Sequence, residues 1–428
     1  MSRFALVLCA LLLAGAAAAG SPPRVDPSTL TGKLIFGYQG WFACPGDAAG
    51  RGWVHWRDAN GFTVDMLPDV SELPAAERCD AGLRAADGDE VFVYSAQDPA
   101  TVDRHFAWME RYGIDGVALQ RFASVLVDPN VRASADRVLA NVRAAAEKHG
   151  RVFFLMYDLS GATADRLALV REDWRRLEAD GLTSSPSYLR HRGHPVLGLW
   201  GLGFAGKPMT PDEARTFLRG IGEASQPFGG VTVVGGVPAQ WRTGTGSASG
   251  DPGWKDVWPM LQVISPWTVG AYRDDASADK YRVQTLEPDI AEARRLGVEL
   301  MPVVFPGFTW ANLMLGRHDE SRAIGNQIPR RCGRFWWRQV VGAVRAGATT
   351  IYGAMFDEVD EGTAMFKIAA HAEESPPAPS FVTLDADGCR LASDFYLRLA
   401  GKGAQLLHAP GRIGDSFPLP VEAPAAKQ

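Results

Sequence analysis

The sequence predicts an α/β fold, a single (β/α)8 barrel with a long loop insertion after its first strand. Eight short apolar stretches recur along the chain, and a helical pattern follows each of them. Their starts are separated by 82, 36, 43, 36, 30, 38 and 50 residues, and most of these spacings fit one strand–helix unit. An open doubly wound sheet is the alternative, but it usually has fewer strands and a glycine-rich first turn.

The predicted strands are short and rich in β-branched or aromatic residues. They cover residues 34–38, 116–120, 152–157, 195–200, 231–235, 261–265, 299–305 and 349–356. The helices between them have ordinary start and stop signals. Asp98-Pro99 begins a helix that ends at Gly113, and 131–149 is followed by Gly150. One further helix begins at Thr210-Pro211, and two others cover 288–296 and 334–345.

The first spacing exceeds one strand–helix unit by roughly 50 residues. Residues 41–97 therefore form a large insertion after strand one, on the face of a barrel that carries catalysis. We assign 33–405 to the barrel and expect 406–428 to be a disordered tail.

The first 20 residues have the pattern of a secretory signal peptide, with one Arg, an apolar run and a stretch of small residues. We therefore expect an exported protein, periplasmic or extracellular, with no membrane association after cleavage. An uncleaved anchor is the alternative. Four cysteines remain in the mature chain, and their order favours the pairs Cys44–Cys79 and Cys332–Cys389. Four free thiols are the other possibility.

Composition and short motifs exclude some classes of function. The chain has 44 basic and 49 acidic residues, a formal charge of −5, and no long basic run, which argues against a nucleic-acid partner. It has no CxxC, HxH or HExxH pattern, so we expect neither a metal nor a cofactor. We expect a monomer.

Aromatic residues occupy nearly every predicted strand end, where a barrel places its reacting groups. Flat aromatic faces stack on sugar rings, while carboxylates and amides bind hydroxyl groups, so this rim suits an oligosaccharide or polysaccharide. The residues expected to contact it are Tyr38, Trp41, Trp53, His55, Trp56, Gln120, Asp158, Trp200, Trp267, Tyr272, Trp310, Asp357 and Asp360.

Four acids crowd the predicted end of strand eight, in Asp357-Glu358-Val359-Asp360-Glu361-Gly362-Thr363. Hydrolysis of a glycosidic bond needs two carboxyl groups, and the predicted ends of strands four and seven carry none. Crowded like charges raise one pKa, which yields a base and an acid. Glu358 and Glu361 are the candidate catalytic pair; a solvated acidic turn is the other interpretation.

This segment resembles the signature Asn/Asp-Glu-x-x-Glu-Gly-Thr of glycoside hydrolase family 99, the endo-α-mannosidases and endo-α-mannanases. The helix from Asp98 into 112–116 is similar to that family, and 34–41 and 301–310 look like bacterial secreted proteins grouped with families 71 and 99. The likeness covers most of 33–370.

The resemblance implies a retaining mechanism without a covalent enzyme intermediate. Glu358 would take the proton of the sugar 2-hydroxyl, which attacks the anomeric carbon and forms a 1,2-anhydro sugar. Glu361 would protonate the leaving oxygen and then activate water. The mannosidases carry Asn, Trp and His in place of Asp357, Val359 and Asp360. A glycosidase for another α-linked sugar, or a carbohydrate-binding barrel without activity, is therefore the alternative.

Overall fold

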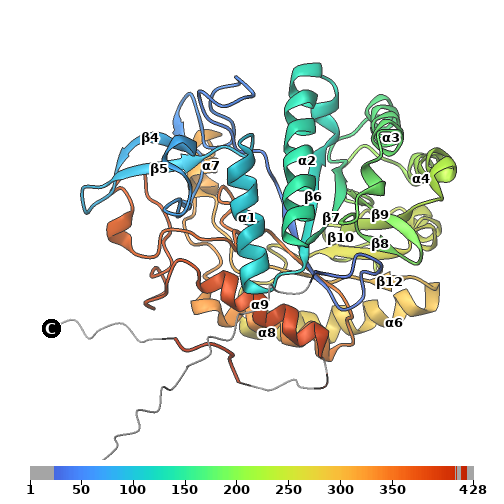
Figure 1. Ribbon diagram of the computed structural model, residues 1–428. Coiled ribbons are helices and arrows are strands. Elements are labelled where there is room, and N and C mark those ends of the chain that lie inside the picture. The colour runs from blue at the N-terminus through green and yellow to red at the C-terminus, as the bar shows by residue number, and fades with distance from the viewer. Residues whose placement is uncertain (1–23, 410, 412–415, 422–428) are drawn as a thin grey trace, which may run out of the picture.

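The computed structural model describes residues 24–409, 411 and 416–421, and the predicted signal peptide lies outside this part of the chain. A parallel sheet curls into a barrel, with helices on its outer side (Figure 1). Its strands are β1 (Leu34–Tyr38), β6 (Gly116–Phe122), β7 (Val152–Asp158), β9 (His194–Trp200), β10 (Thr232–Pro238), β11 (Val263–Trp267), β12 (Glu299–Leu300), β13 (Val303–Val304) and β14 (Ile351–Gly353). A short strand, β8 (Arg190–His191), pairs antiparallel with β9.

The seventh strand of the barrel is split, and its two halves join the ends of the sheet. β12 pairs with β11, whereas β13 pairs with β14. Between the halves, the Met301 amide donates to Ile264 O at 2.9 Å, and Pro302 O accepts from the Tyr352 amide at 2.8 Å. Proline has no N–H to give to a ladder, so the pairing changes partner at this residue. The predicted (β/α)8 barrel is confirmed.

The helices surround the sheet. They are α1 (Pro99–Tyr112), α2 (Pro129–His149), α3 (Ala164–Ala179), α4 (Pro211–Ser225), α5 (Asp275–Tyr281), α6 (Glu287–Leu296), α7 (Ala311–Gly316), α8 (Arg334–Arg345) and α9 (Phe395–His408). α2 begins two residues before its predicted start, because the Asp128 side chain accepts from the Asn130 and Val131 amides and caps the helix there. α1 ends as predicted, at Gly113 in the left-handed conformation.

One strand–helix unit departs from the prediction. Within the described residues, only two 3-10 turns, Pro252–Asp256 and Trp258–Met260, lie between β10 and β11, where an α-helix was expected. Residues 243–250 are rich in Gly, Ser and Thr, which favour loops over helix. Trp254 and Trp258 are both buried and stack with ring centroids 5.3 Å apart, so two large side chains fill the space of the missing helix.

The segment between β1 and α1 forms two hairpins, β2 (Arg57–Asp58) with β3 (Gly61–Phe62) and β4 (Arg78–Arg84) with β5 (Glu90–Tyr94). The β4–β5 hairpin projects beside the barrel (Figure 1). The disulfide Cys44–Cys79 ties this segment together, as predicted. The segment also bonds to the chain beyond β14, because the Asp65 amide donates to Val359 O at 2.9 Å.

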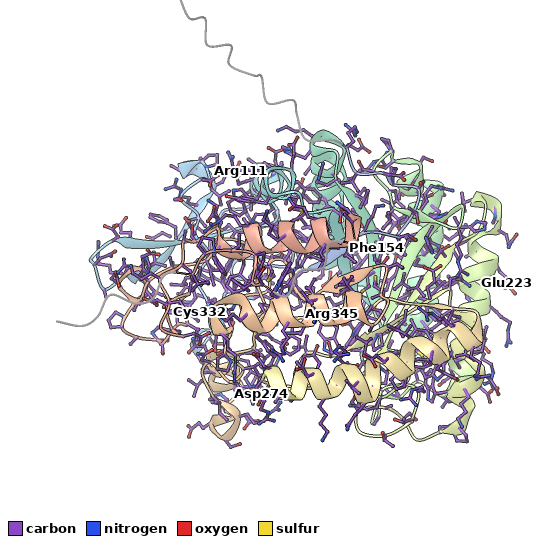
Figure 2. The ribbon with its side chains drawn as sticks, turned by 90° about the horizontal axis from the view of Figure 1, so that it is seen from below. Arg111, Phe154, Glu223, Asp274, Cys332 and Arg345 are labelled. Atoms are coloured by element: carbon purple, nitrogen blue, oxygen red, sulfur yellow. A yellow bond between two sulfur atoms is a disulfide. The ribbon has the colours of Figure 1, made fainter. Side chains whose placement is uncertain are left out.

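The second predicted disulfide, Cys332–Cys389, is also confirmed. It ties the start of α8 to the chain before α9, and these two helices run side by side on the underside of the barrel (Figure 2). The tail differs from the expected disorder at two places. α9 continues to His408, and Phe417 stacks on Phe395 with centroids 6.4 Å apart, because an apolar ring gains by packing against the core. The rest of 406–428 lies mostly outside the described residues. In the part that the structure describes, no helix is long and apolar enough to cross a membrane.

Candidate active site

The acidic segment that follows β14 is fixed to the end of β1, its neighbour in the barrel. Asp357 is buried, and its carboxylate accepts from the backbone amides of Gln39 at 2.7 Å and Gly40 at 2.9 Å. Burial raises the pKa of Asp357 to about 7, and these two hydrogen bonds oppose the rise. Asp357 therefore joins two strand ends and is expected to position the glutamate that follows it.

Glu358 is buried, and both of its oxygens have a donor. Oε1 accepts from Gln39 Nε2 and Oε2 accepts from Thr363 Oγ1, each at 2.7 Å. Burial and repulsion by Glu361 raise the pKa of Glu358 well above its ordinary value, whereas the two donors lower it. The carboxylate is thus held in one orientation by neighbouring side chains.

Glu361 is half-buried, and its carboxylate makes no hydrogen bond to the described residues. Its backbone O accepts from the Thr309 amide at 3.1 Å, which fixes the main chain beneath the side chain. Burial and repulsion by Asp360 raise the pKa of Glu361 to about 7, and Arg317 opposes the rise. Two interacting carboxyl groups titrate as a pair, so the raised pKa values belong to Glu358 and Glu361 together.

Asp360 connects this segment to the loop before β2. Its Oδ2 lies 3.3 Å from His55 Nδ1, while its Oδ1 is buried and has no hydrogen-bond partner among the described residues. The His55 ring stacks on Trp41, with centroids 3.8 Å apart and planes within 4°. Trp41 in turn stacks on Phe122 at 5.4 Å. The predicted contact residues Trp41, His55 and Asp360 thus form one continuous unit.

Other predicted aromatic residues gather in two further groups. Trp200 and Trp267 meet edge to face at 5.5 Å. Trp310 packs against Phe308 at 5.0 Å, and the Arg322 guanidinium lies over it at 4.4 Å. The indole nitrogens of Trp41, Trp200 and Trp310 are buried and have no hydrogen-bond partner in the described part of the chain. Buried donors of this kind are suited to ligand hydroxyl groups.

Two predicted polar residues lie at neighbouring strand ends. Gln120 Nε2 donates to the Tyr352 hydroxyl at 2.9 Å. Gly37 leaves room for this hydroxyl, because a Cβ at Gly37 would lie 2.1 Å from it. Asp158 pairs in register with Trp200 and accepts from the Ser160 amide at 2.6 Å. Burial raises the pKa of Asp158.

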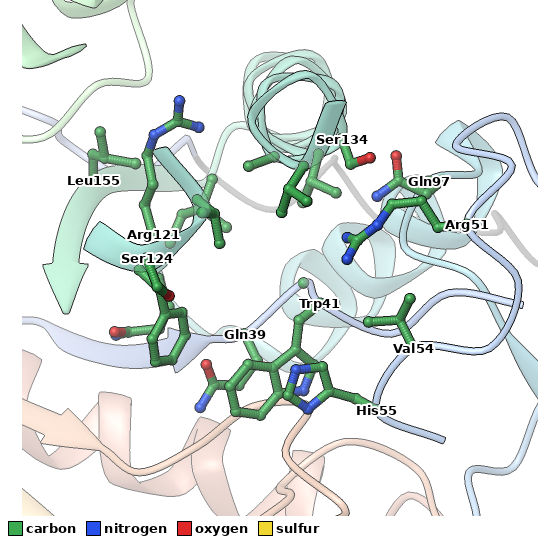
Figure 3. Close-up of a pocket in the computed structure, with 18 residues that line it drawn as sticks. Gln39, Trp41, Arg51, Val54, His55, Gln97, Arg121, Ser124, Ser134 and Leu155 are labelled. Atoms are coloured by element: carbon green, nitrogen blue, oxygen red, sulfur yellow. The ribbon is translucent and has the colours of Figure 1, made fainter. Parts of the chain in front are cut away.

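A cavity of about 320 Å³ lies beside the end of β1 (Figure 3). Its walls come from the ends of β1 and β6, from α2 and from the segment 41–97. Figure 3 shows the His55 imidazole lying against the Trp41 indole at one side of the cavity. Gln39, which holds Glu358, also lines it, so the cavity and the acids share a wall.

Three predicted contact residues lie in the core instead of at the rim. Tyr38 points outward from the barrel, where its hydroxyl bonds to His105 of α1 at 2.9 Å. Trp56 is fully buried and donates to Tyr94 O at 2.7 Å. The Tyr272 hydroxyl donates to Gln339 of α8 at 3.0 Å. All three are therefore corrected to packing residues.

Trp53 lies in the segment between β1 and α1, and its contact with a ligand stays a prediction. It is half-buried and packs edge to face on Phe62 at 6.3 Å. The contact set also omitted Gln39 and Thr363, the two donors to Glu358. Gln39 could have been identified from its position directly after strand one, and Thr363 from its place at the end of the acidic motif. No group of three or more His, Cys, Asp or Glu side chains arranged to hold a metal lies within the described residues.

Comparison with known proteins supports the fold. No family model and no curated protein matches the chain. Two structures of the GH99 endo-α-mannosidase from Bacteroides thetaiotaomicron are similar to it. The first, a complex with BIS-TRIS-propane, has a TM-score of 0.65 and 16% identity and covers 90% of this chain and 99% of its own. The second has a TM-score of 0.64 and 15% identity, and the alignment covers 90% of this chain and 100% of that structure's chain. A glycoside hydrolase-like protein has a TM-score of 0.54 and 10% identity and covers 90% and 97%.

Proposed function

We propose that this protein is an exported glycoside hydrolase that cleaves an α-linked glycan, a mannan-like or related polysaccharide, with retention of configuration. The observation that carries the proposal is the pair Glu358 and Glu361 at one strand end, both with raised pKa values. The similarity in fold to the endo-α-mannosidase supports the same function class. Two disulfides are consistent with export.

In the first step of the proposed reaction, Glu358 accepts the proton of the sugar 2-hydroxyl. The freed oxygen attacks the anomeric carbon, and the bond from that carbon to the leaving oxygen breaks. Glu361 gives its proton to the leaving oxygen, so charge does not accumulate on it. The product of this step is a 1,2-anhydro sugar.

In the second step, Glu361 takes a proton from water as the water oxygen attacks the anomeric carbon. The bond from that carbon to the 2-oxygen opens, and the 2-oxygen recovers its proton from Glu358. Each glutamate has then returned to its first state. Two displacements at one carbon give net retention.

The donors around Glu358 suit this role. Gln39 and Thr363 orient the carboxylate and stabilise its charged form, which is the form that accepts a proton. Glu361 has no comparable donor and is partly exposed, so its proton can pass to a leaving oxygen and be replaced by water. The aromatic groups around Trp41, Trp200 and Trp310 supply stacking faces and indole donors for sugar units.

The test combines product analysis with substrate analogues. The protein is incubated with a panel of α-linked polysaccharides, and the products are separated by chromatography. We expect short oligosaccharides, with retention seen by NMR of fresh product. Binding without any product would instead support a carbohydrate-binding barrel.

A 2-deoxy analogue of a cleaved substrate tests the mechanism, because it lacks the attacking hydroxyl. We expect no turnover of the analogue although it binds. Normal turnover, or a sugar covalently attached to the protein in mass spectrometry, would contradict the anhydro-sugar route.

A further inference from the structure

The acid cluster, defined as Asp357, Glu358, Asp360 and Glu361, receives a hydrogen bond from a basic side chain at one corner. His55 Nδ1 lies 3.3 Å from Asp360 Oδ2, and the Asp360 side chain is only 5% exposed. Asp360 stands between the two glutamates in the sequence, and its negative charge raises the pKa of both. A group that contacts Asp360 therefore bears on both glutamates.

Other groups around Asp360 do not compensate its charge. Asp65, beneath the segment, is a buried carboxylate whose own pKa is raised by burial and, to a smaller extent, by Asp360. Tyr94 of β5 is a buried phenol whose pKa is raised by burial and by the acids of the cluster. Arg317 acts on Glu361 from the end of α7. In the described part of the chain, His55 is thus the basic group in direct contact with Asp360.

His55 is held in place through both its backbone and its ring. Its backbone has a φ of 61°, in the left-handed region that a residue with a side chain rarely adopts. Its backbone O accepts from Thr63 Oγ1 at 3.0 Å, and its ring lies flat on Trp41 (Figure 3). The His55 side chain is 38% exposed, and its Nδ1 faces Asp360.

We propose that His55 is a positioning residue that sets the protonation of Glu361 through Asp360. This inference rests on the acid role proposed above for Glu361. The imidazole N–H that faces Asp360 Oδ2 offsets part of the charge that Asp360 places on Glu361, so Glu361 loses its proton at a lower pH. Without the imidazole, the full charge of Asp360 acts on Glu361, which keeps its proton to a higher pH.

The first experiment measures the Glu361 carboxyl directly, in the full chain with 13C-labelled glutamate. Comparison with the Glu361→Gln spectrum assigns the signal. His55→Phe keeps a ring on Trp41 but removes the hydrogen-bond donor to Asp360, and we expect it to raise the Glu361 pKa by on the order of one pH unit. Asp360→Asn should lower it. His55→Phe added to Asp360→Asn should produce no further change, because the charge that transmits the effect is gone.

The second experiment measures kcat against pH on a cleaved glycan. In His55→Phe the alkaline limb should move upward with the Glu361 pKa, and in Asp360→Asn it should move downward. The control is the pair His371 and Asp385, 3.7 Å apart in another part of the molecule. His371→Phe should leave both the carboxyl signal and the alkaline limb unchanged.

An unchanged Glu361 pKa in His55→Phe would overturn the inference, as would an equal rise with Asp360→Asn already present. A lower melting temperature with an unmoved carboxyl signal would likewise show a role in packing alone. Failure of the proposed function has a different result. If no glycan is cleaved but the Glu361 signal responds as described, the control by His55 stands and the glycosidase assignment falls.

Discussion

Glu361→Gln is expected to abolish most activity and, at alkaline pH, to stabilise the protein. The substitution keeps the shape of the side chain but cannot give or take the proton. General acid–base groups contribute about 10²- to 10⁴-fold in rate, so kcat should fall by that amount. Activity of the wild type should decline as the pH rises through about 7, where Glu361 loses its proton. The residual activity of the variant should lack that decline.

The stabilising effect follows from the same pKa. Burial raises the pKa of Glu361 from 4.5 to about 7, so the folded state holds this proton more tightly than the unfolded chain does. The associated stability is complete below pH 4.5 and is lost as the pH rises through about 7. A difference of about 2.5 between the two pKa values corresponds to about 3 kcal/mol of unfolding free energy. A neutral amide avoids this cost at pH 8 and gains nothing at pH 4.

The assay is thermal unfolding of wild type and variant between pH 4 and pH 9, beside kcat on one cleaved glycan. Glu223→Gln, at an exposed position on α4, is the control and should not change the pH dependence of the melting temperature. An aryl glycoside with a good leaving group should restore cleavage in Glu361→Gln but not in Glu358→Gln, since such a group leaves without a proton. Wild-type rates in Glu361→Gln, or a stability gain of equal size at pH 4 and pH 8, would refute the reasoning.

Three further predictions concern stability and packing. Replacing Cys332 and Cys389 by Ser removes a bond that spans 57 residues and should lower the free energy of unfolding in denaturant by about 4 kcal/mol. Trp56→Ala should cost about 3 to 5 kcal/mol because it empties a buried site, while substrate affinity of the folded fraction, measured by titration, should not change. Arg121→Ala should cost about 3 kcal/mol in the same denaturation assay, because it removes the 2.7 Å ion pair to the buried Asp173 and leaves Arg176 as its remaining ion-pair partner.

Much of the barrel could be predicted because buried parallel strands appear in a sequence as short apolar runs. The split of the seventh strand could not, since residues 299–305 form one apolar run and the change of partner at Pro302 is a property of the closed sheet. The absence of an α-helix before β11 could not be predicted for a related reason. Trp254 and Trp258 fill its place, and the apolar content alone did not distinguish them from a helix.

For the site, a position at a strand end predicts the edge of the barrel but not the face to which a side chain points. Consecutive side chains on a strand alternate, so Gly37 faces the interior and Tyr38 faces α1. Trp56 and Tyr272 were misplaced because loop sequences carry no such period. The acidic motif could be identified as a candidate site from the sequence, because its four acids lie within a few consecutive positions.

The bonds between the β1 end and the acidic segment have a consequence for the order of events during synthesis. The Gln39 amide and the Asp357 carboxylate that it binds are 318 positions apart in the chain. Contacts between such distant segments form late, since the loop between them must first be closed. A ribosome has made more than three quarters of the protein before the partner of Gln39 exists. The acid cluster is therefore assembled only when translation is nearly finished, and a nascent chain carries an open β1 edge until then.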